Sequence, residues 1–186
     1  MKNIKSKKEY IKNLIRENNL KTDKNGKNLI NININDNSNI LSSFSKDKPL
    51  ISNDLSEYIN KETYPLNLKN GLHININSNE ISENDKTLYK QAIINYYEND
   101  LINSYRKNKR MIIISLIFLL LGIIVLSISL IVSNNNDHII ASQVYDIIAW
   151  VFVWEATDIF FLQKPEINHK AKISFEIINS EITFNE

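Results

Sequence analysis

The chain contains no cysteine among its 186 residues. This absence excludes disulfide bonds, a thiol nucleophile and any zinc or iron–sulfur site built on cysteine. Glycine is nearly as scarce, and its three residues form neither a phosphate-binding loop nor a dinucleotide-binding pattern. A net charge of one sign is also lacking, because 22 basic residues stand against 21 acidic ones. The balance gives no support to nucleic-acid binding by the chain as a whole, so we expect no nucleic-acid partner.

Asparagine and isoleucine are abundant, with 29 and 33 residues. Together with frequent lysine, this composition is typical of proteins from AT-rich genomes. Such a bias raises the number of asparagines regardless of function. A single asparagine is therefore weak evidence for a site.

Charged and apolar residues are segregated along the chain. Residues 1–110 hold 19 basic and 13 acidic residues, a net charge of +6, whereas residues 111–186 hold 3 and 8, a net charge of −5. The segment 111–133 is uncharged, and 17 of its 23 residues are Ile, Leu, Val or Phe. A helix of this length is about 35 Å long, enough to cross a hydrocarbon core of about 30 Å. The sequence therefore predicts a first transmembrane helix over 111–133.

A second apolar segment follows at 139–162, after a short polar loop at 134–138. Its twelve Ile, Leu, Val and Phe residues favour insertion by about 4–7 kcal/mol. It also carries Asp146, Glu155 and Asp158, each of which would cost about 2.5–3.5 kcal/mol at the bilayer centre. All three lie away from the midpoint near Trp150, so the segment is marginal alone but plausible as the return arm of a transmembrane hairpin.

Flanking charges predict the orientation of this hairpin. Basic residues precede the first segment and follow the second, while the loop between them has no Lys or Arg; the flanking residues are Arg106, Lys107, Lys109, Arg110, Lys164, Lys170 and Lys172. The positive-inside rule then places both termini in the cytoplasm of a multi-pass inner (cell) membrane protein. No apolar segment near Met1 resembles a cleavable signal peptide. Labelling of residue 136 only from the cytoplasmic side would contradict this topology.

Residues 1–45 are rich in Asn, Lys, Ser and Ile, and we expect a low-complexity basic arm that builds no core. Within 1–27, nine basic and three acidic residues accompany four apolar ones at a helical spacing: Ile4, Ile11, Leu14 and Ile15. One interpretation is an amphipathic helix on the anionic inner leaflet. The favoured interpretation is a solvated, disordered arm, since the apolar face is thin.

Residues 46–110 are expected to form a small cytosolic α+β module. A short helix is predicted over 53–62, followed by apolar alternation from Tyr64 to Ile76. We interpret this alternation as a β-hairpin with a three-residue loop, in which Gly71 adopts the left-handed conformation. A helix capped at Ser82 is expected from 83 to about 107. No Gly or Pro separates it from the first span, so one continuous helix could enter the membrane. The tail, residues 164–186, alternates from 173 onward and predicts one or two strands that join the hairpin.

The acids of the second span are the strongest candidates for function. In an antiparallel hairpin Asp146 is expected level with Ser127, and Asp158 level with Ser115, so that each serine could satisfy an acid by a hydrogen bond. Alternatively the acids line a water-filled path between subunits, which would suit cation or proton conduction. A third interpretation pairs Glu155 and Asp158 with the basic cluster 106–110.

The sequence offers little support for catalysis. The three histidines, His73, His138 and His169, are scattered without a metal-ligand spacing, and no nucleophile lies in a recognisable frame. We therefore expect no catalytic residue, no metal site and no cofactor. The run from Phe152 to Phe161, FVWEATDIFF, resembles runs in uncharacterised bacterial two-span membrane proteins over about the last 120 residues. This resemblance implies a membrane hairpin but no activity.

The sequence thus predicts a mainly α membrane protein with four parts: a disordered basic arm (1–45), a cytosolic α+β module (46–110), a two-helix transmembrane hairpin (111–163, with spans 111–133 and 139–162) and a cytosolic tail strand (164–186). The expected function is that of an integral membrane accessory or interaction protein, self-associating or bound to another membrane protein. The alternative is a subunit of an oligomeric pore or transporter that uses the intramembrane acids.

Overall fold

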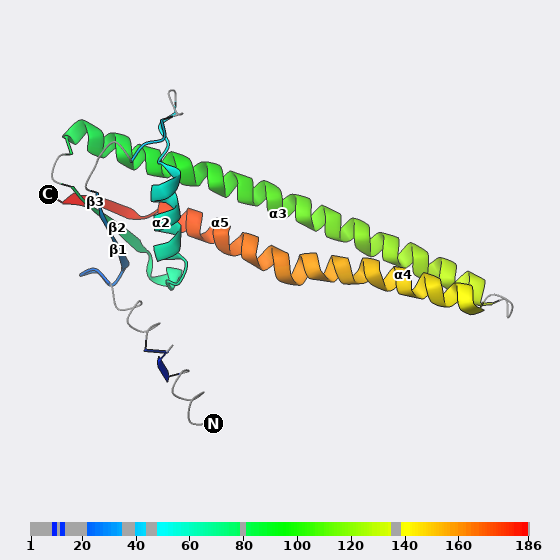
Figure 1. Cartoon of the computed structure of the whole chain (residues 1–186). Helices are drawn as coiled ribbons and strands as arrows, with labels where there is room; N and C mark the ends of the chain where they lie inside the picture. The colour runs from blue at the N-terminus through cyan, green and yellow to red at the C-terminus, as the bar shows by residue number, and fades with distance from the viewer. Residues whose placement is uncertain are drawn as a thin grey trace. The chain divides into compact units, whose positions relative to one another are not determined.

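The computed structural model describes residues 9–10, 12–13, 22–34, 40–43, 48–78, 81–134 and 139–185. The chain divides into two compact units: unit 1 comprises residues 1–101 and 172–186, and unit 2 comprises residues 102–171 (Figure 1). Most of the described chain is helical, with one long apolar helix and a small parallel sheet. The proposed amphipathic helix within 1–27 falls largely outside the described residues, as does most of the loop 134–138.

Unit 1 is built around a three-stranded parallel sheet. Its strands are β1 (Asn28–Asn33), β2 (Leu72–Asn77) and β3 (Glu181–Asn185), in the order β1-β2-β3. The register aligns Ile30 with Ile74 and Ile74 with Ile182, so apolar side chains lie side by side on one face. Parallel neighbours require a crossover. Helix α2 (Asn53–Thr63) lies between β1 and β2, and all of unit 2 lies between β2 and β3.

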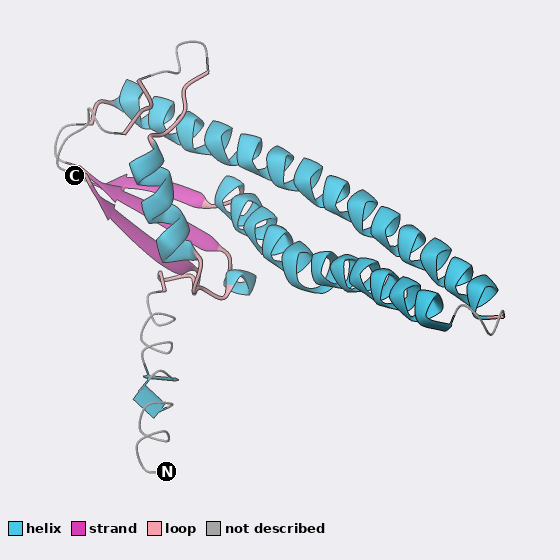
Figure 2. Ribbon diagram, turned by 45° about the vertical axis from the view of Figure 1, so that its right-hand side comes forward, coloured by secondary structure: helices cyan, strands magenta, loops and turns pink. Residues whose placement is uncertain are grey.

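Helices α2, α3 and α5, as far as the structure describes unit 1, cover only one face of this sheet. Both crossovers step in the same direction across the strands, and crossovers of the same hand then fall on the same face. Accordingly, α2, the first turns of α3 (Glu83–Ser133) and the end of α5 (Lys164–Ile178) share one core with the strands, through residues such as Ile59, Ile93 and Ile177. Figure 2 shows α2 lying across the strands. The opposite face carries the alternate, polar side chains.

The prediction that residues 1–45 build no core is wrong for 28–33. Those residues form β1, and Ile30 and Ile32 are 2% and 3% exposed within the core. Strict alternation of isoleucine with asparagine gives this segment one apolar face and one polar face, which is the pattern of a strand covered on one side. Low complexity therefore concealed a regular strand.

The predicted antiparallel hairpin over 64–76 is also wrong. Residues Leu68–Asn70 form a short 3-10 helix, η2, and β2 pairs in parallel with both of its neighbours. Gly71 does adopt a positive φ of 75°, but its ψ of 177° is not that of the predicted left-handed conformation, and the residue ends η2 and leads into β2. The local alternation correctly indicated which side chains of β2 face the core. It could not indicate the partner strands, because β1 and β3 lie far away in the sequence.

The helices before the apolar segment follow the sequence closely. α2 begins after Ser52, whose hydroxyl accepts from the Leu55 N–H at 3.3 Å. α3 begins after Ser82, whose hydroxyl accepts from the Asp85 N–H at 3.2 Å, and the helix continues unbroken for 51 residues. Both caps satisfy backbone donors that a helix start leaves free. The expected helix from 83 therefore does run directly into the apolar segment.

The tail only partly follows its prediction. Residues 173–177, expected as a strand, belong to helix α5, and the strand β3 begins at Glu181. Ile173 and Ile177 are four residues apart and both buried, which suits a helix face as well as a strand face. β3 does join the strand of the module, as expected for a tail that completes the sheet.

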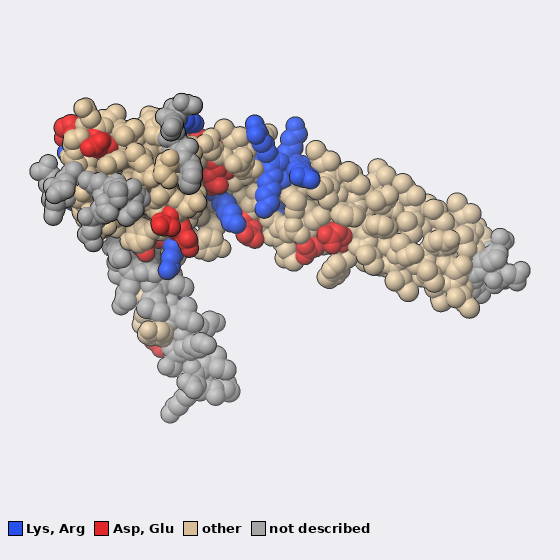
Figure 3. Space-filling view, turned by 45° about the horizontal axis from the view of Figure 1, so that its top comes forward, with Lys and Arg blue, Asp and Glu red and all other residues tan. Residues whose placement is uncertain are grey.

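Unit 2 contains the apolar part of α3, helix α4 (Ile139–Asp158), a π-helical turn η4 (Ile159–Gln163) and the start of α5. Among the described residues α3 alone is long and apolar enough to cross a membrane, and no second candidate span meets the same test. The expected hairpin of two spans is thus shown only in its first helix. On the face seen in Figure 3, the apolar stretch of unit 2 carries no basic side chain.

Small residues face each other between α3 and α4. The buried positions recur every seven residues on each helix: Ser115, Gly122 and Ser129 on α3, and Ser142, Ala149 and Ala156 on α4. A seven-residue repeat is typical of two helices that coil around each other, and small side chains let their backbones approach closely. Large side chains such as Leu130 (70% exposed) and Trp154 (72% exposed) point outward. This distribution is the inverse of that in a soluble protein.

Candidate functional site

The uncovered polar face of the sheet carries the densest polar network of the described residues. Asparagines at equivalent positions of β1 and β2 bond across the strands: the Asn75 amide donates to Asn31 at 3.1 Å, and the Asn77 amide donates to Asn33 at 2.8 Å. Asn75 also donates to the Asn77 side-chain oxygen at 3.1 Å. Parallel, in-register strands bring identical side chains together, so asparagine ladders of this kind are stable. The ladder fixes which way each amide points.

Asp23 reaches the start of this face from a turn that precedes β1. Its Oδ1 accepts from the backbone N–H groups of Asn25 (2.7 Å) and Lys27 (3.0 Å), and Gly26 supplies the positive φ of 78° that the turn needs. The second oxygen, Oδ2, points away from the turn. The turn therefore holds the Asp23 carboxylate with one oxygen directed at β2.

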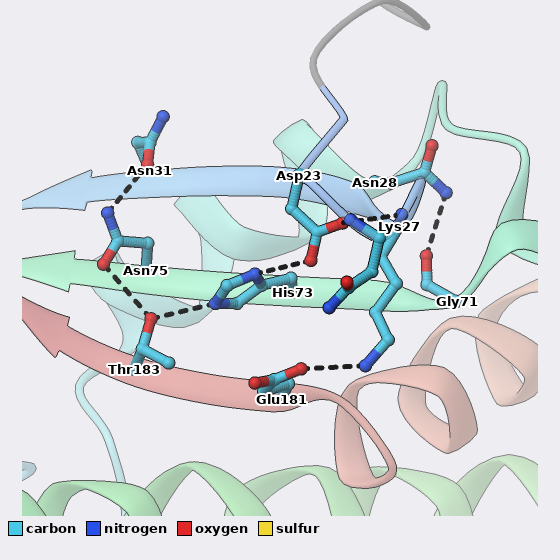
Figure 4. Close-up of polar contacts among 10 residues, drawn as sticks. Asp23, Lys27, Asn28, Asn31, Gly71, His73, Asn75, Glu181 and Thr183 are labelled. Atoms are coloured by element: carbon cyan, nitrogen blue, oxygen red, sulfur yellow. Dashed lines mark hydrogen bonds and ion pairs between the residues drawn. The ribbon is translucent and has the colours of Figure 1, made fainter.

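His73, on β2, lies between Asp23 and Thr183. Its Nδ1 is 2.9 Å from Asp23 Oδ2 and its Nε2 is 2.9 Å from the Thr183 hydroxyl (Figure 4). The His73 side chain is 16% exposed and that of Asp23 only 9%. The three groups therefore form a largely buried chain of polar contacts across one end of the polar face.

The last member of this chain, Thr183, also contacts β2. Its hydroxyl donates to Asn75 Oδ1 at 3.3 Å, and the Asn75 amide nitrogen is already directed at Asn31 and Asn77. Which ring nitrogen of His73 donates and which accepts depends on the tautomer. Because Nδ1 faces a carboxylate oxygen of Asp23, a proton or a cation must lie between the two atoms.

Glu181 and Lys27 complete the cluster. The Lys27 ammonium donates to Glu181 Oε2 at 2.8 Å, and the two side chains are 37% and 47% exposed. This hydrogen bond lowers the pKa of the Glu181 carboxyl and raises the pKa of Lys27. Desolvation alone would raise the pKa of Asp23, but the hydrogen bonds from the Lys27 N–H, His73 and the Asn25 N–H together lower it. Both carboxylates are thus held in the charged form.

One oxygen or nitrogen from each of Asp23, His73 and Glu181 lies within 4.8 Å of the others. The sequence shows no metal-ligand spacing, and His73 stands isolated in it. The signal was absent locally, because Asp23 and His73 are 50 residues apart and Lys27 and Glu181 are 154 residues apart. Only the pairing of β1, β2 and β3 brings these groups together.

The order carboxylate, imidazole, hydroxyl also occurs in hydrolytic triads, in which the hydroxyl gives its proton to the imidazole. In this protein the Thr183 hydroxyl also lies 3.3 Å from Asn75 Oδ1, an acceptor that competes with the imidazole for the hydroxyl proton.

The candidates named within the second apolar segment have different partners from those expected. Asp146 accepts from Ser129 at 2.6 Å rather than from Ser127, which bonds to the Ile123 carbonyl of its own helix at 2.8 Å. Ser115 donates to the Ala156 carbonyl at 2.9 Å rather than to Asp158. Residue numbers at equal depth sum to 271, as in Ser115–Ala156 and Ser129–Ser142, whereas the numbers of each expected pair sum to 273.

The remaining acids do not form the expected pairs. Asp158 accepts from the Gln163 amide at 2.8 Å, across the π-helical turn η4, and Glu155 is exposed. The ion pairs found among the described residues include none between either acid and the basic cluster 106–110. These acids therefore lie on or beside α4 without a charged partner from α3.

Comparison of the chain with protein-family models, with curated proteins and with solved structures finds no match to any of them. The geometry of the chain therefore carries the functional argument alone.

Proposed function

We propose that this chain is an integral membrane protein whose α3–α4 hairpin spans the bilayer twice and anchors the α/β module of unit 1 at the cytoplasmic surface. One observation carries the proposal. β2, before the hairpin, and β3, after it, are neighbouring strands of one sheet. Two paired strands lie on the same side of a membrane, so the chain between them crosses it an even number of times. If α3 crosses once, a second crossing must follow before Glu181.

Helix α4 supplies that second crossing. It faces α3 with Ser142, Ala149 and Ala156 and exposes large apolar side chains such as Ile147 (65%) and Trp150 (67%). Small residues inside and large apolar residues outside are typical of helices that pack in lipid. Asp146, the acid nearest the middle of the helix, has Ser129 as a partner within the hairpin. This bond lowers the cost of placing it in the bilayer.

Single-cysteine labelling tests the topology cleanly, because the native chain has no cysteine. Lys69→Cys, before β2, and Asn179→Cys, before β3, are both exposed positions and should label from the cytoplasmic side. Asn136→Cys should label from the opposite side, and Ser127→Cys should resist aqueous reagents. If residues 69 and 179 labelled from opposite sides, α3 would be the sole span and the proposal would fail.

The role that this arrangement supports is that of a membrane-anchored accessory or interaction protein without catalytic activity. Its sheet presents a polar face that no described helix covers, although parallel sheets usually have both faces covered. In membranes we expect the protein to crosslink to itself or to another membrane protein through the outer face of α4. A chain that stayed monomeric in native mass spectrometry and formed no crosslink from positions 150 or 154 would argue against this role.

The alternative of an ion-conducting oligomer rests on Glu155, which is exposed on α4 and has no hydrogen bond or ion pair among the described residues. Reconstituted protein that passes cations, with conduction lost in Glu155→Gln but kept in Glu166→Gln, would favour the pore over the accessory role. Absence of conduction in the wild-type chain would exclude it.

A further inference from the structure

We infer that the cluster of Asp23, His73 and Glu181 is a binding site for a divalent transition-metal ion of the zinc type, held by Asp23 Oδ2, His73 Nδ1 and a Glu181 carboxylate oxygen. The inference goes beyond the membrane anchoring proposed above and does not depend on it. One imidazole and two carboxylates form a donor set that suits zinc and neighbouring divalent ions. Three protein ligands leave a fourth position for water or a partner's group.

The ligand geometry fits with small movements. The donor atoms lie within 4.8 Å of one another, and His73 Nδ1 and Asp23 Oδ2 are already 2.9 Å apart. A tetrahedral zinc ion with bonds of about 2.0–2.1 Å holds its ligand atoms about 3.3 Å apart. Glu181, whose side chain is 47% exposed, can rotate to close the remaining distance while the backbone stays paired.

The groups around the ligands orient them as a metal site requires. A metal-bound histidine usually donates its other ring N–H to an acceptor, which fixes the tautomer. Here Nε2 lies 2.9 Å from the Thr183 hydroxyl, which accepts the Nε2 hydrogen when a metal takes Nδ1, and Nδ1 is directed at Asp23 Oδ2. Asp23 Oδ1 is occupied by two backbone N–H groups, so Oδ2 is the oxygen available to a metal. These hydrogen bonds to Asp23 and His73 are present before any ion arrives.

Lys27 occupies the position of a competing cation. Its ammonium lies 2.8 Å from Glu181 Oε2 and neutralises one of the two carboxylates. A metal ion must displace this contact, and the Lys27 side chain is exposed enough at 37% to swing into solvent. The site therefore has two states, closed by Lys27 or closed by the metal.

The competition provides a test that misfolding cannot imitate. Full-length protein in lipid nanodiscs is titrated with Zn²⁺ in competition with a chromogenic chelator, and with Co²⁺ for its absorption spectrum. Lys27→Met should bind Zn²⁺ about tenfold or more tightly than wild type, because removing a like charge a few ångströms away favours a cation by at least that factor. A damaged fold would instead weaken binding.

The ligand and second-shell variants complete the test. His73→Gln should abolish the 1:1 binding, and Thr183→Val should weaken it about 10–100-fold, since Nε2–H loses its acceptor. His169→Gln is the matched control and should bind as wild type. Zn²⁺ should also shift the His73 Nδ1 nitrogen resonance in the wild-type chain.

Two results would overturn the site. One is Zn²⁺ binding that survives in His73→Gln, and the other is Lys27→Met that binds no more tightly than wild type. Neither result depends on how many times the chain crosses the membrane, so failure of the site and failure of the anchoring proposal can be told apart.

Discussion

At the scale of single residues, Gly122 controls how closely α3 and α4 approach. A Cβ at this position would lie 2.9 Å from Val153 Cγ2 and 3.4 Å from the Ala149 carbonyl oxygen. Val153 is β-branched and cannot move aside by a simple rotation, and the carbonyl belongs to the helix backbone. No other residue type fits this position without separating the two helices.

Gly122→Ile should therefore weaken the hairpin by about 1–3 kcal/mol, the usual cost of overpacking. The measurement is unfolding in mixed micelles followed by tryptophan fluorescence, because the two tryptophans of the chain, Trp150 and Trp154, both lie on α4. Ser127→Ile is the matched control: it places the same side chain at an exposed position of the same helix. Equal losses in both variants would contradict close packing at Gly122.

Charge at the polar face should make unit 1 sensitive to acid. The pKa values of Asp23 and Glu181 are lowered from their ordinary values of 3.8 and 4.5. The two carboxylates therefore make their full contribution to the stability of the fold when the pH is above those values. It is lost as the pH falls through the lower pKa values of the folded state. The raised pKa of Lys27 adds a contribution to the stability of the fold that is present below pH 10.5 and is lost at higher pH.

The double variant Asp23→Asn/Glu181→Gln should accordingly show a smaller loss of stability than wild type when the pH is lowered from 6 to about 3. Thermal unfolding followed by near-ultraviolet circular dichroism of the tyrosines measures this difference. Glu57→Gln, at an exposed position of α2, should leave the pH profile unchanged. A double variant as acid-sensitive as wild type would show that these carboxylates do not link folding to pH.

At the scale of elements, α2 is joined to α3 by a buried tyrosine. Tyr97 has no exposed surface, and its hydroxyl donates toward the Ser56 carbonyl and Asn60 Oδ1, each at 3.3 Å. Burial raises the pKa of Tyr97 well above its ordinary value. The hydroxyl therefore stays protonated and acts as a donor from α3 to α2.

Tyr97→Phe should reduce the free energy of unfolding of unit 1 by about 0.5–1.5 kcal/mol, because two acceptors on α2 lose their donor in a buried place. Hydrogen exchange of the α2 amides at increasing urea concentration measures this loss in the free energy of unfolding. Tyr96→Phe is the control: its ring stacks edge-on against Tyr97 with centroids 5.2 Å apart, yet its side chain is half-buried. A larger effect at 96 than at 97 would reverse our assignment.

At the scale of the whole molecule, the chain leaves the sheet after β2 and returns to it as β3. Ile182 is 9% exposed and belongs to the same core as Ile30 and Ile74. A strand that follows the entire hairpin therefore stabilises a strand that precedes it. The sheet of unit 1 is therefore complete only after β3 has been added to it.

Ile182→Ala should lower the stability of unit 1 by about 2–5 kcal/mol, as expected when a buried isoleucine is truncated. Limited proteolysis should then cleave more rapidly around residues 28–33, far from the substitution in sequence. Phe175→Ala, also after the hairpin but 54% exposed, should leave cleavage unchanged. Unchanged protection in Ile182→Ala would mean that β3 is dispensable.

Much of the helical structure could be predicted from the sequence. The uncharged run 111–133, the caps at Ser52 and Ser82 and the positive φ of Gly71 depend on neighbouring residues alone. Local sterics and local hydrogen bonds determine such features, so they are visible in a short window. The alternation in 72–77 likewise revealed which side chains of β2 would be buried.

The sheet topology and the site could not be predicted in the same way. Alternation says which face a strand buries but not which strand lies beside it, and β1, β2 and β3 are separated by a helix or by the whole hairpin. The high asparagine content of the chain made any single asparagine uninformative. In the fold they form a hydrogen-bonded ladder, because the register aligns Asn31 and Asn33 with Asn75 and Asn77. The helix over 173–177 was not predicted, because a spacing of four residues fits both the helical period and the strand period.

The sequence by itself determined that this protein has an uncharged helix long enough to cross a membrane, because length and hydrophobicity act residue by residue. Only the tertiary structure decided that Asp23, His73 and Glu181 share one place. It did so because the core on the other face of the sheet aligns β1, β2 and β3, and the polar side chains on the open face follow that register.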